Sequence, residues 1–475
     1  MPRPELYGVR DASVRKWRFS IGLPMPLRYL IPDHGEVVTT PVPQSGFLTM
    51  SDILEIHPIR QRVDADLTVP GSKSYTNRAM LIAALADGRS RLLDALESDD
   101  TRYMAGALST LGVSIVNESD GTLTVDGAGG RVPVPNAELF VGNSGTTARF
   151  LTAYVSLGNG AYTLDGAPRM RERPIQDLID GLRPLGVNVR CPAGNGCPPV
   201  VVDASGLGGG RTQLPGDRSS QYLSALLMVA PYAQKDVEVR VTGNLVSRPY
   251  VDMTVNIMRD FGVIVGTRGA SVFHVKAGQR YAPAEYPIEP DASNASYFFA
   301  AAALTGGRVK VRNLSRESAQ GDVGFVDVLD RMGCAVSNRR DGIEVRGPER
   351  LSGIDVDMNA MPDVVQTLCA LAPFAAGPVT VRNIANLRIK ETDRIAAVAA
   401  ELTRLGVRTD VRPDAVTVYP AAHIRPAELD TYEDHRMAMS MALIGLKAPG
   451  IAIRNPACVD KSFPSYFQCL DELRG

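Results

Sequence analysis

The sequence predicts an α/β protein built from six similar units of roughly 70 residues each. Two phrases recur with this period. The first is an amphipathic helix that ends in glycine and leads into a short Val-rich strand, as in LRPLGVNV and MRDFGVIV. The second is a turn, then polar residues and an apolar helix, as in GNSGTTARFLTAYV. Because two independent phrases keep the same period, a repeat architecture explains the chain better than chance does.

The first phrase predicts five helix ends, each followed by a hairpin. Glycine suits the left-handed residue that closes a helix, and Asp341-Gly342 before IEVRG is a strong hairpin signal. The five glycines lie 71 to 76 residues apart: Gly112, Gly186, Gly262, Gly333 and Gly406. Two of the preceding helices have clear apolar stripes, namely Ile175, Leu178, Ile179, Leu182 and Leu185, and Phe325, Val328, Leu329 and Met332.

The second phrase predicts six helix starts and a closed ring of units. The starts lie 71 to 74 residues apart, at Gly71, Gly142, Gly216, Pro290, Pro362 and Glu433. The last helix, LDELRG, stands at the end of the sequence without a following hairpin. We expect ILEIHPIRQRVDADLTVP, near the other end, to supply that hairpin. The six units would then close through the two ends of the chain.

Composition places the chain among ordinary globular proteins of two or three domains. It has 475 residues, 44% hydrophobic and 22% charged, with a net charge of -1. This balance gives no general attraction to nucleic acid or to an anionic membrane. The six cysteines form no C-x-x-C pair and the five histidines show no metal-ligand spacing. We therefore expect reduced thiols, a cytoplasmic location and no metal. Residues 1–50 contain the only tryptophan and several prolines, and we expect a poorly ordered N-terminal extension there.

The helix start in VPGSKSYTNRAMLIAALADG indicates an anion site. A nucleotide-binding P-loop is excluded, because Ser72 stands where the motif needs the second glycine and Leu67 where it needs the first. The free N–H groups of a helix start, together with Lys73 and Arg78, still suit an anion. The alternative is a Ser-capped surface helix with solvated basic residues.

The remaining helix starts and loops supply many cations and hydroxyls but few carboxylates. This mixture suits a small polyanionic substrate with an acid and a base beside it. Each carboxylate also has an ordinary explanation: Asp363 could be a helix N-cap, and Glu391 could belong to a surface ion-pair helix with Lys390 and Arg394.

Nine segments, in order, resemble the 5-enolpyruvylshikimate-3-phosphate synthase family from about residue 52 to 475. They are PGSKSYTNRA, GNSGTTAR, DGAPRMRERPI, SSQYLSALLM, SRPY, DVVQTL, RIKETDR, YEDHRMAM and DKSFPSYF. The resemblance implies two domains, each of three β/α units packed around a pseudo-threefold axis. Domain one would comprise residues 51–71 and 290–475, and domain two residues 72–289. The chain would cross between them near 70–72 and 288–291.

The resemblance also implies the substrates and the site. Shikimate 3-phosphate would be bound by Lys73, Ser74, Arg78, Ser219, Ser220, Gln221, Ser247, Asp363, Asn386 and Lys390. Phosphoenolpyruvate would be bound by Lys73, Gly145, Arg173, Gln221, Arg394, Arg436 and Lys461. Asp363 would take the proton of the shikimate hydroxyl, while Glu391, helped by Lys73, would handle the proton at the phosphoenolpyruvate methylene. No metal or organic cofactor is implied, and a monomer that closes around its substrates is expected.

Other functions remain as alternatives. The related transferase acting on UDP-N-acetylglucosamine has a reactive cysteine in the loop that here reads LDGAPRMRERP, and Cys191 and Cys197 fall later, in a predicted hairpin. A non-catalytic repeat scaffold would not need Asp363, Glu391 and Lys73 together. An RNA-terminal cyclase shares the general fold only by analogy. The family resemblance also implies a glyphosate target. Gly145 leaves room for this inhibitor, whereas Phe150, where relatives commonly have proline, would narrow its space.

Overall fold

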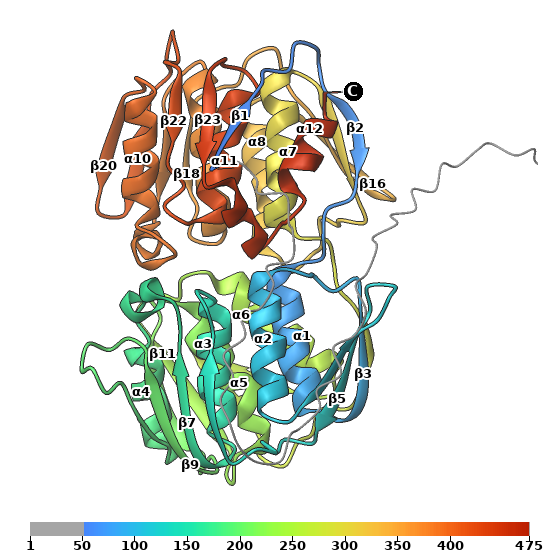
Figure 1. The fold of residues 1–475 in the computed structure, drawn as a ribbon, viewed down its shortest axis with the longest axis vertical. Helices are drawn as coiled ribbons and strands as arrows, with labels where there is room; N and C mark the ends of the chain where they lie inside the picture. The colour runs from blue at the N-terminus through green and yellow to red at the C-terminus, as the bar shows by residue number, and fades with distance from the viewer. Residues whose placement is uncertain (1–51, 475) are drawn as a thin grey trace, which may run out of the picture. The chain divides into compact units, whose positions relative to one another are not determined.

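The computed structural model describes residues 52–474, which form an α/β fold of twelve α-helices and twenty-three strands in six sheets (Figure 1). The prediction of six repeated β/α units is confirmed. In the representative unit, strand β6 leads through helix α3 to the parallel strand β7, and helix α4 then leads to the hairpin β8–β9.

Five of the sheets share one order of four strands. The first two strands are parallel, the third is antiparallel to the second, and the fourth pairs with the third as a hairpin. In spatial order they are β6 (Asn136–Phe140), β7 (Asn159–Asp165), β9 (Val200–Ser205) and β8 (Asn188–Arg190); β10 (Gly210–Pro215), β11 (Val237–Thr242), β13 (Val272–Val275) and β12 (Val265–Arg268); β14 (Glu285–Pro287), β3 (Asp87–Leu93), β5 (Leu123–Ala128) and β4 (Ser114–Asn117); β2 (Asp64–Leu67), β15 (Arg308–Arg312), β17 (Gly342–Arg346) and β16 (Ala335–Arg339); and β18 (Ile354–Asp357), β19 (Val379–Arg382), β21 (Ala415–Val418) and β20 (Thr409–Arg412).

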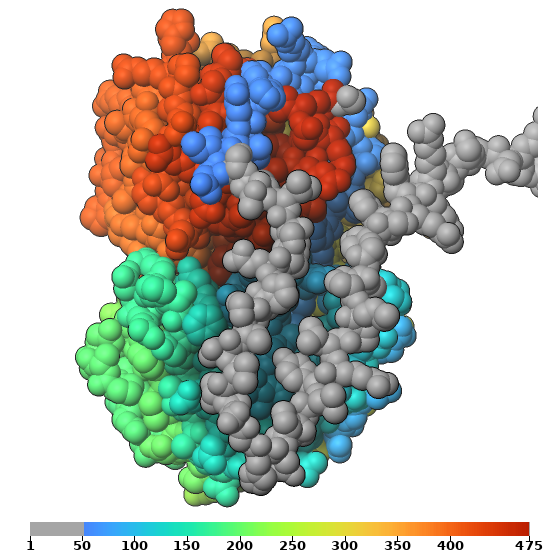
Figure 2. All heavy atoms as spheres, in the orientation of Figure 1, coloured from blue at the N-terminus to red at the C-terminus, as the bar shows by residue number. Residues whose placement is uncertain are grey.

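The sixth sheet corrects one prediction. It has three strands, β22 (Ala427–Leu429), β23 (Ile451–Arg454) and β1 (Ile53–Ile56), and only β1 comes from the other end of the chain. The strand expected to complete a hairpin with it, β2, instead pairs in parallel with β15 of the neighbouring sheet. Pro58, which has no N–H to donate, follows β1 closely, and the chain leaves the sheet there. The prediction that the ring of units closes through both ends of the chain is therefore correct. The two N-terminal strands, however, join two different sheets, β1 beside β23 and β2 beside β15. Figure 2 shows the segment around β1 lying against residues of the C-terminal end.

The helices of the second phrase are buried on all sides, because small and apolar side chains fill their faces. In α3 all eleven residues are buried, and the same holds for α11. Figure 1 shows α3 beside α5, with α2 next to them and the strands β7 and β9 outside them. These inner helices are α1 (Lys73–Leu85), α3 (Gly145–Val155), α5 (Ser220–Val229), α7 (Ala292–Thr305), α9 (Val365–Leu371) and α11 (His435–Gly445).

The helices of the first phrase alternate with them and bury one stripe. All nine stripe residues singled out in the sequence are at most 2% exposed. These outer helices are α2 (Asp99–Thr110), α4 (Gln176–Leu182), α6 (Arg248–Asp260), α8 (Phe325–Arg331) and α10 (Arg394–Arg404), with α12 (Tyr466–Glu472) at the C-terminal end. The five glycines that follow the first five of these helices have φ between 79° and 102°, as predicted for left-handed helix ends. The hairpin predicted at Asp341-Gly342 joins β16 to β17.

The buried apolar side chains form two large clusters. One is drawn from residues 75–288, and the other from residues 56–69 together with 292–473. Two chain segments lie side by side where the sequence passes from one cluster to the other. Gly71 and Pro290 form an isolated antiparallel bridge, the Ser72 N–H donates to Glu289 O (2.8 Å), and the Asp291 N–H donates to Pro70 O (2.9 Å).

The prediction for residues 1–50 lies outside the described part of the chain. Among residues 52–474, the six sheets and the two apolar clusters already form the complete ring of six units. We therefore expect a protein that starts at Met50 to melt like the full chain, as measured by calorimetry on both. At an unfolding entropy of about 2.1 cal/mol/K per residue, a fall of the midpoint by more than about 4 °C would mean that residues 1–49 add roughly 4 kcal/mol of stability and are not dispensable. No helix in residues 52–474 combines the length and apolarity needed to span a membrane.

Candidate active site

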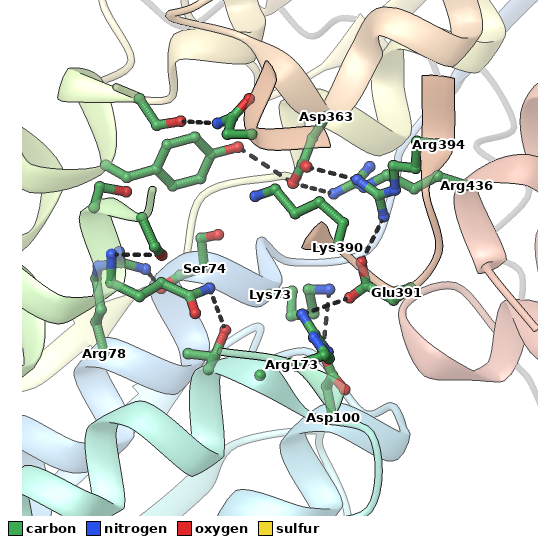
Figure 3. A pocket seen from close by; sticks show the side chains of 18 residues that line it. Lys73, Ser74, Arg78, Asp100, Arg173, Asp363, Lys390, Glu391, Arg394 and Arg436 are labelled. Carbon is green, nitrogen blue, oxygen red and sulfur yellow. Dashed lines mark hydrogen bonds and ion pairs between the residues drawn. The ribbon is translucent and has the colours of Figure 1, made fainter. Parts of the chain in front are cut away.

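The starts of five of the six inner helices, or the turns directly before them, meet at one pocket between residues of both clusters (Figure 3). Its lining is dominated by cations, hydroxyls and amides. The lining residues are Lys73, Ser74, Arg78, Asp100, Gly145, Thr146, Arg173, Ser219, Ser220, Gln221, Ser247, Tyr250, Asp363, Asn386, Lys390, Glu391, Arg394 and Arg436. Fifteen of them were named as site residues from the sequence. Lys461, also named, does not line the pocket but contacts Asp100, which does.

The start of α1 differs from a Ser-capped surface helix. Ser72 takes the N-cap position but its hydroxyl accepts no cap hydrogen bond, and the helix is buried. The carboxylate of Asp291 accepts the Lys73 N–H instead (3.0 Å), while it also caps α7 by accepting the Asn294 N–H (2.9 Å). One backbone donor of α1 is thus already satisfied, and the side chains of Lys73 and Ser74 are the groups that face the pocket.

Asp363 lies between two guanidinium groups. It belongs to the 3₁₀ helix η5 (Pro362–Val364) and caps no helix. Arg394 Nη1 donates to its Oδ1 (3.0 Å) and Arg436 Nη2 to its Oδ2 (2.9 Å), as Figure 3 shows. The N-cap explanation for Asp363 is therefore wrong.

Glu391 is equally enclosed by cations. It is only 8% exposed, so the surface ion-pair explanation is wrong as well. Arg394 Nη2 donates to it at 2.9 Å, and Arg173 Nη2 lies 3.5 Å from its other oxygen. Arg169 holds the turn in place, since its guanidinium donates to the carbonyl oxygens of Glu391 (2.9 Å) and Lys390 (3.1 Å).

Asp100 links two lysines that come from distant parts of the sequence. It lies at the start of α2, where its Oδ2 is 3.1 Å from Lys73 Nζ and its Oδ1 accepts a hydrogen bond from Lys461 Nζ (2.6 Å). Lys461 ends the 3₁₀ helix η8 (Pro456–Lys461) and also donates to Asn143 O (2.8 Å). The pair of ammonium groups is thereby held at one edge of the pocket.

The hydroxyl-rich wall comes from the starts of α5 and α6. Ser219 caps α5 by accepting the Gln221 N–H (3.2 Å), and Gln221 Nε2 donates to Thr146 Oγ1 (3.2 Å). Ser247 has a left-handed backbone, φ 54°, which is uncommon for a residue with a side chain. Its hydroxyl accepts a hydrogen bond from Asn386 Nδ2 (3.4 Å). Strained backbone of this kind is typical of ligand-binding positions.

The charges of the pocket shift each other's protonation. Burial alone would raise the pKa of Asp363 and Glu391, but the surrounding cations outweigh it and hold both pKa values well below the ordinary range. Arg436 and Lys390 lead this effect at Asp363, and Arg173 and Arg394 at Glu391. Burial also lowers the pKa of Arg78 to about 10. Both carboxylates are therefore ionised near neutral pH.

Three lining residues were not assigned from the sequence. Thr146 lies in the first turn of α3, within GNSGTTAR, a segment of the resemblance. Asp100 follows Ser98 and Asp99 at a helix start, where acidic residues are expected for local reasons. Tyr250 lies within SRPY, a segment of the resemblance, and this position was the available signal. Its hydroxyl donates to Asp322 Oδ2 (2.8 Å) and lies 3.5 Å from Asp363 Oδ2.

The loop that separates the two transferase families contains no cysteine. The 3₁₀ helix η1 (Pro168–Glu172) supplies arginines, and Cys191 and Cys197 lie in the connection between β8 and β9, as predicted. The six cysteines are free thiols. Among residues 52–474, no group of three or more His, Cys, Asp or Glu side chains is arranged to hold a metal ion.

Fold and site together define an enolpyruvyl-transferase-type α/β enzyme with a cation-rich pocket. The chain belongs to the EPSP synthase family, whose model (3-phosphoshikimate 1-carboxyvinyltransferase) matches residues 58–470. It is 52% identical to the 3-phosphoshikimate 1-carboxyvinyltransferase of Nostoc punctiforme over 417 residues, covering 88% of this chain and 98% of the relative. The Shewanella baltica enzyme of the same name is 46% identical over 425 residues, 89% of this chain and 99% of the relative. A solved structure of EPSP synthase from Acinetobacter baumannii superposes with a TM-score of 0.75 at 26% identity, covering 89% of this chain and 98% of that one.

Proposed function

We propose that this chain transfers the carboxyvinyl group of phosphoenolpyruvate to the 5-hydroxyl of shikimate 3-phosphate and releases phosphate, a step of aromatic amino acid biosynthesis. The observation that carries the proposal is the pocket itself, in which fifteen of the sixteen residues assigned from the sequence line one cavity. Two substrates that each bear a phosphate and a carboxylate need many fixed cations, and buried cations bind such groups strongly.

Shikimate 3-phosphate would occupy the hydroxyl-rich wall. Ser219, Ser220 and Gln221 offer donors at the start of α5, and Arg78 supplies a charge. Phosphoenolpyruvate would lie toward Gly145 and a group of five cations, Arg173, Arg394, Arg436, Lys73 and Lys461. The absence of a side chain at Gly145 supports this placement, because the guanidinium groups of Arg149 and Arg173 lie where a Cβ would be, beside the start of α3, and suit an anion there.

Asp363 and Glu391 would act on the two protons of the reaction. Asp363 takes the proton of the attacking 5-hydroxyl, while Glu391, helped by Lys73, serves the methylene carbon. The resulting tetrahedral intermediate then loses phosphate. In the protein alone the cations keep both pKa values low. Bound phosphate and carboxylate groups share those cations, so the pKa of each carboxyl rises and proton transfer becomes easier.

Phosphate release tests the proposal. Release is expected with both substrates together and not with either alone, and UDP-N-acetylglucosamine should not replace shikimate 3-phosphate. Release with that sugar nucleotide would favour the related transferase instead. Release with no combination would favour the non-catalytic scaffold.

We further propose the division into domain one, residues 51–71 with 290–475, and domain two, residues 72–289, linked at the paired crossings. The two separate apolar clusters support this division. A monomer is proposed, which sedimentation of the purified protein would test. A cytoplasmic location is proposed as well, supported by six thiols that are free.

One prediction concerns Asp100 and the pH dependence of phosphoenolpyruvate use. Burial lowers the pKa of Lys461, and Asp100 opposes that effect. Asp100→Asn should lower the pKa of Lys461 further, so the amine loses its proton at lower pH. The alkaline limb of kcat/KM for phosphoenolpyruvate should then move to lower pH, as measured by initial rates from pH 6 to 10.

The neighbouring residue provides a matched control. Asp99 lies on the same helix but is only half-buried and pairs with Arg102 (2.7 Å) outside the pocket. Asp99→Asn should leave the limb unchanged. If Asp100→Asn also left it unchanged, Asp100 would have no electrostatic role in the site.

A further inference from the structure

A second buried carboxyl lies behind the pocket, at Asp322. It belongs to the 3₁₀ helix η4 (Gly321–Gly324) and is 4% exposed. Tyr250 Oη donates to its Oδ2 (2.8 Å), and Ser293 Oγ donates to the same oxygen (2.5 Å). Its other oxygen, Oδ1, has no hydrogen-bond partner among residues 52–474. A carboxylate that is buried with one bare oxygen is poorly stabilised and tends to hold a proton.

Tyr250 lies between Asp322 and Asp363. It comes from α6, near the helix start, and its hydroxyl contacts both acids: Asp322 at 2.8 Å and Asp363 at 3.5 Å. A phenol has one proton to donate and an oxygen that can accept, so it can pass a proton without gaining charge. The Tyr250 ring also lies 5.9 Å from the Arg78 guanidinium, in the wall of the same pocket.

The two acids differ in how well they can keep a proton. The cations around Asp363, led by Arg436, hold its pKa well below the ordinary range. At Asp322, burial first and the charge of Asp363 second raise the pKa to about 6, although Arg436, Ser293 and Tyr250 oppose this. Of the elements packed against η4, α8 adds no charge toward Asp322, since its Asp327 pairs with Arg316 on the exposed side.

We propose that Asp322 receives, through Tyr250, the proton that Asp363 takes from the substrate hydroxyl. The inference rests on the proposed function. The substrate O–H bond breaks and the proton moves to Asp363. Asp363 then passes it to the Tyr250 oxygen as Tyr250 gives its own proton to Asp322. Tyr250 ends neutral, Asp363 is again a carboxylate between its arginines, and Asp322 is a carboxylic acid until the proton leaves with the products. Asp322 and Tyr250 are thus positioning groups behind the catalytic carboxylate.

The experiment is a pH profile of kcat with both substrates saturating. In the wild type, kcat should fall below about pH 6, because Asp322 is then already protonated and cannot accept. Asp322→Asn should lower kcat at pH 7.5 by about 10-fold or more and remove this acid limb, while both KM values change less than about threefold. Tyr250→Phe should lower kcat in the same way, because the phenyl ring cannot pass a proton.

Two further variants separate this role from a structural one. Ser293→Ala removes a hydrogen bond that lowers the pKa of Asp322, so the acid limb should move to higher pH with the fold retained. Asp177→Asn is the matched control: burial also raises the pKa of Asp177, but it pairs with Arg218 away from Asp363. Its profile should equal that of the wild type.

The outcomes distinguish the two proposals. If the wild type releases phosphate but Asp322→Asn keeps both its kcat and its acid limb, the relay is wrong and the proposed function stands. An unmoved limb in Ser293→Ala would also overturn the relay. If the wild type releases no phosphate with the two substrates, the proposed function itself fails.

Discussion

Asp363→Asn is expected to lower kcat by at least about 10², and Glu391→Gln by a similar factor, because neither amide can accept a proton. The amides keep the shape of the carboxylates, so the guanidinium groups around them stay close. Arg394 retains Asp434 as a partner after the Asp363 change, with Nε donating to Oδ2 at 2.7 Å. We therefore expect the fold to survive. The measurements are kcat, both KM values and the melting midpoint.

The control for these variants is an exposed aspartate. Asp357 ends β18 and accepts the Asn359 N–H (2.9 Å) without touching the pocket, so Asp357→Asn should turn over like the wild type. A variant of Asp363 or Glu391 that keeps near-normal kcat would remove that residue from the mechanism. A variant that raises only KM would show that its carboxylate binds substrate without transferring a proton.

Gly145→Ala is expected to raise the glyphosate inhibition constant about 10- to 100-fold, which corresponds to the 1–3 kcal/mol that overpacking costs. A Cβ on Gly145 would collide with the Arg149 guanidinium and would lie 2.6 Å from Arg173 Nη2. Both are the ends of flexible side chains, so they would shift and the anion site would contract. Glyphosate is longer than phosphoenolpyruvate and has less room to adjust. The KM for phosphoenolpyruvate should therefore rise less than the inhibition constant.

Phe150→Pro serves as the comparison. The sequence predicts a sensitive enzyme with somewhat weakened inhibition, on the ground that Phe150 shifts the helix start. In the structure Phe150 is the sixth residue of α3, fully buried, with its ring 5.2 Å from Arg78 Cζ. Phe150→Pro should therefore change the KM for shikimate 3-phosphate, because Phe150 packs on Arg78, more than it changes the glyphosate inhibition constant. An unchanged inhibition constant in Gly145→Ala would mean that Gly145 does not face the inhibitor.

The repeat could be predicted from the sequence because its signals are local. A glycine that must adopt positive φ can be recognised from the few residues around it. A buried helix can likewise be recognised from its own residues, because it has no polar face. Asp100 could not be found this way, since its partner Lys461 is 361 residues away and its own neighbours explain it as a helix start. Asp322 could not be identified for the same reason, because its proposed role depends on its hydrogen bond with Tyr250, which lies 72 residues away in the sequence.

The incorrect prediction that β1 and β2 form one hairpin has a related cause. The local pattern indicated two strands near the N-terminal end but not which sheet each would join. β2 has the same length as β1, four residues, and either could lie at a sheet edge. The choice is made by packing against β15 and β23, which lie far away in the sequence.

This pairing has a consequence for the order in which the protein can form on the ribosome. β1 leaves the ribosome early, but its partner β23 is made about 400 residues later, roughly 20–80 s at ordinary synthesis rates. Residues 75–288 meanwhile complete a hydrophobic cluster of their own and can fold while the nascent chain is still growing. β2 stays unpaired until β15 (Arg308–Arg312) has been made, and β1 stays unpaired until β23 (Ile451–Arg454) has been made. Products that stop between β15 and β23 should therefore aggregate or engage chaperones through β1, residues 53–56, whose partner strand they lack.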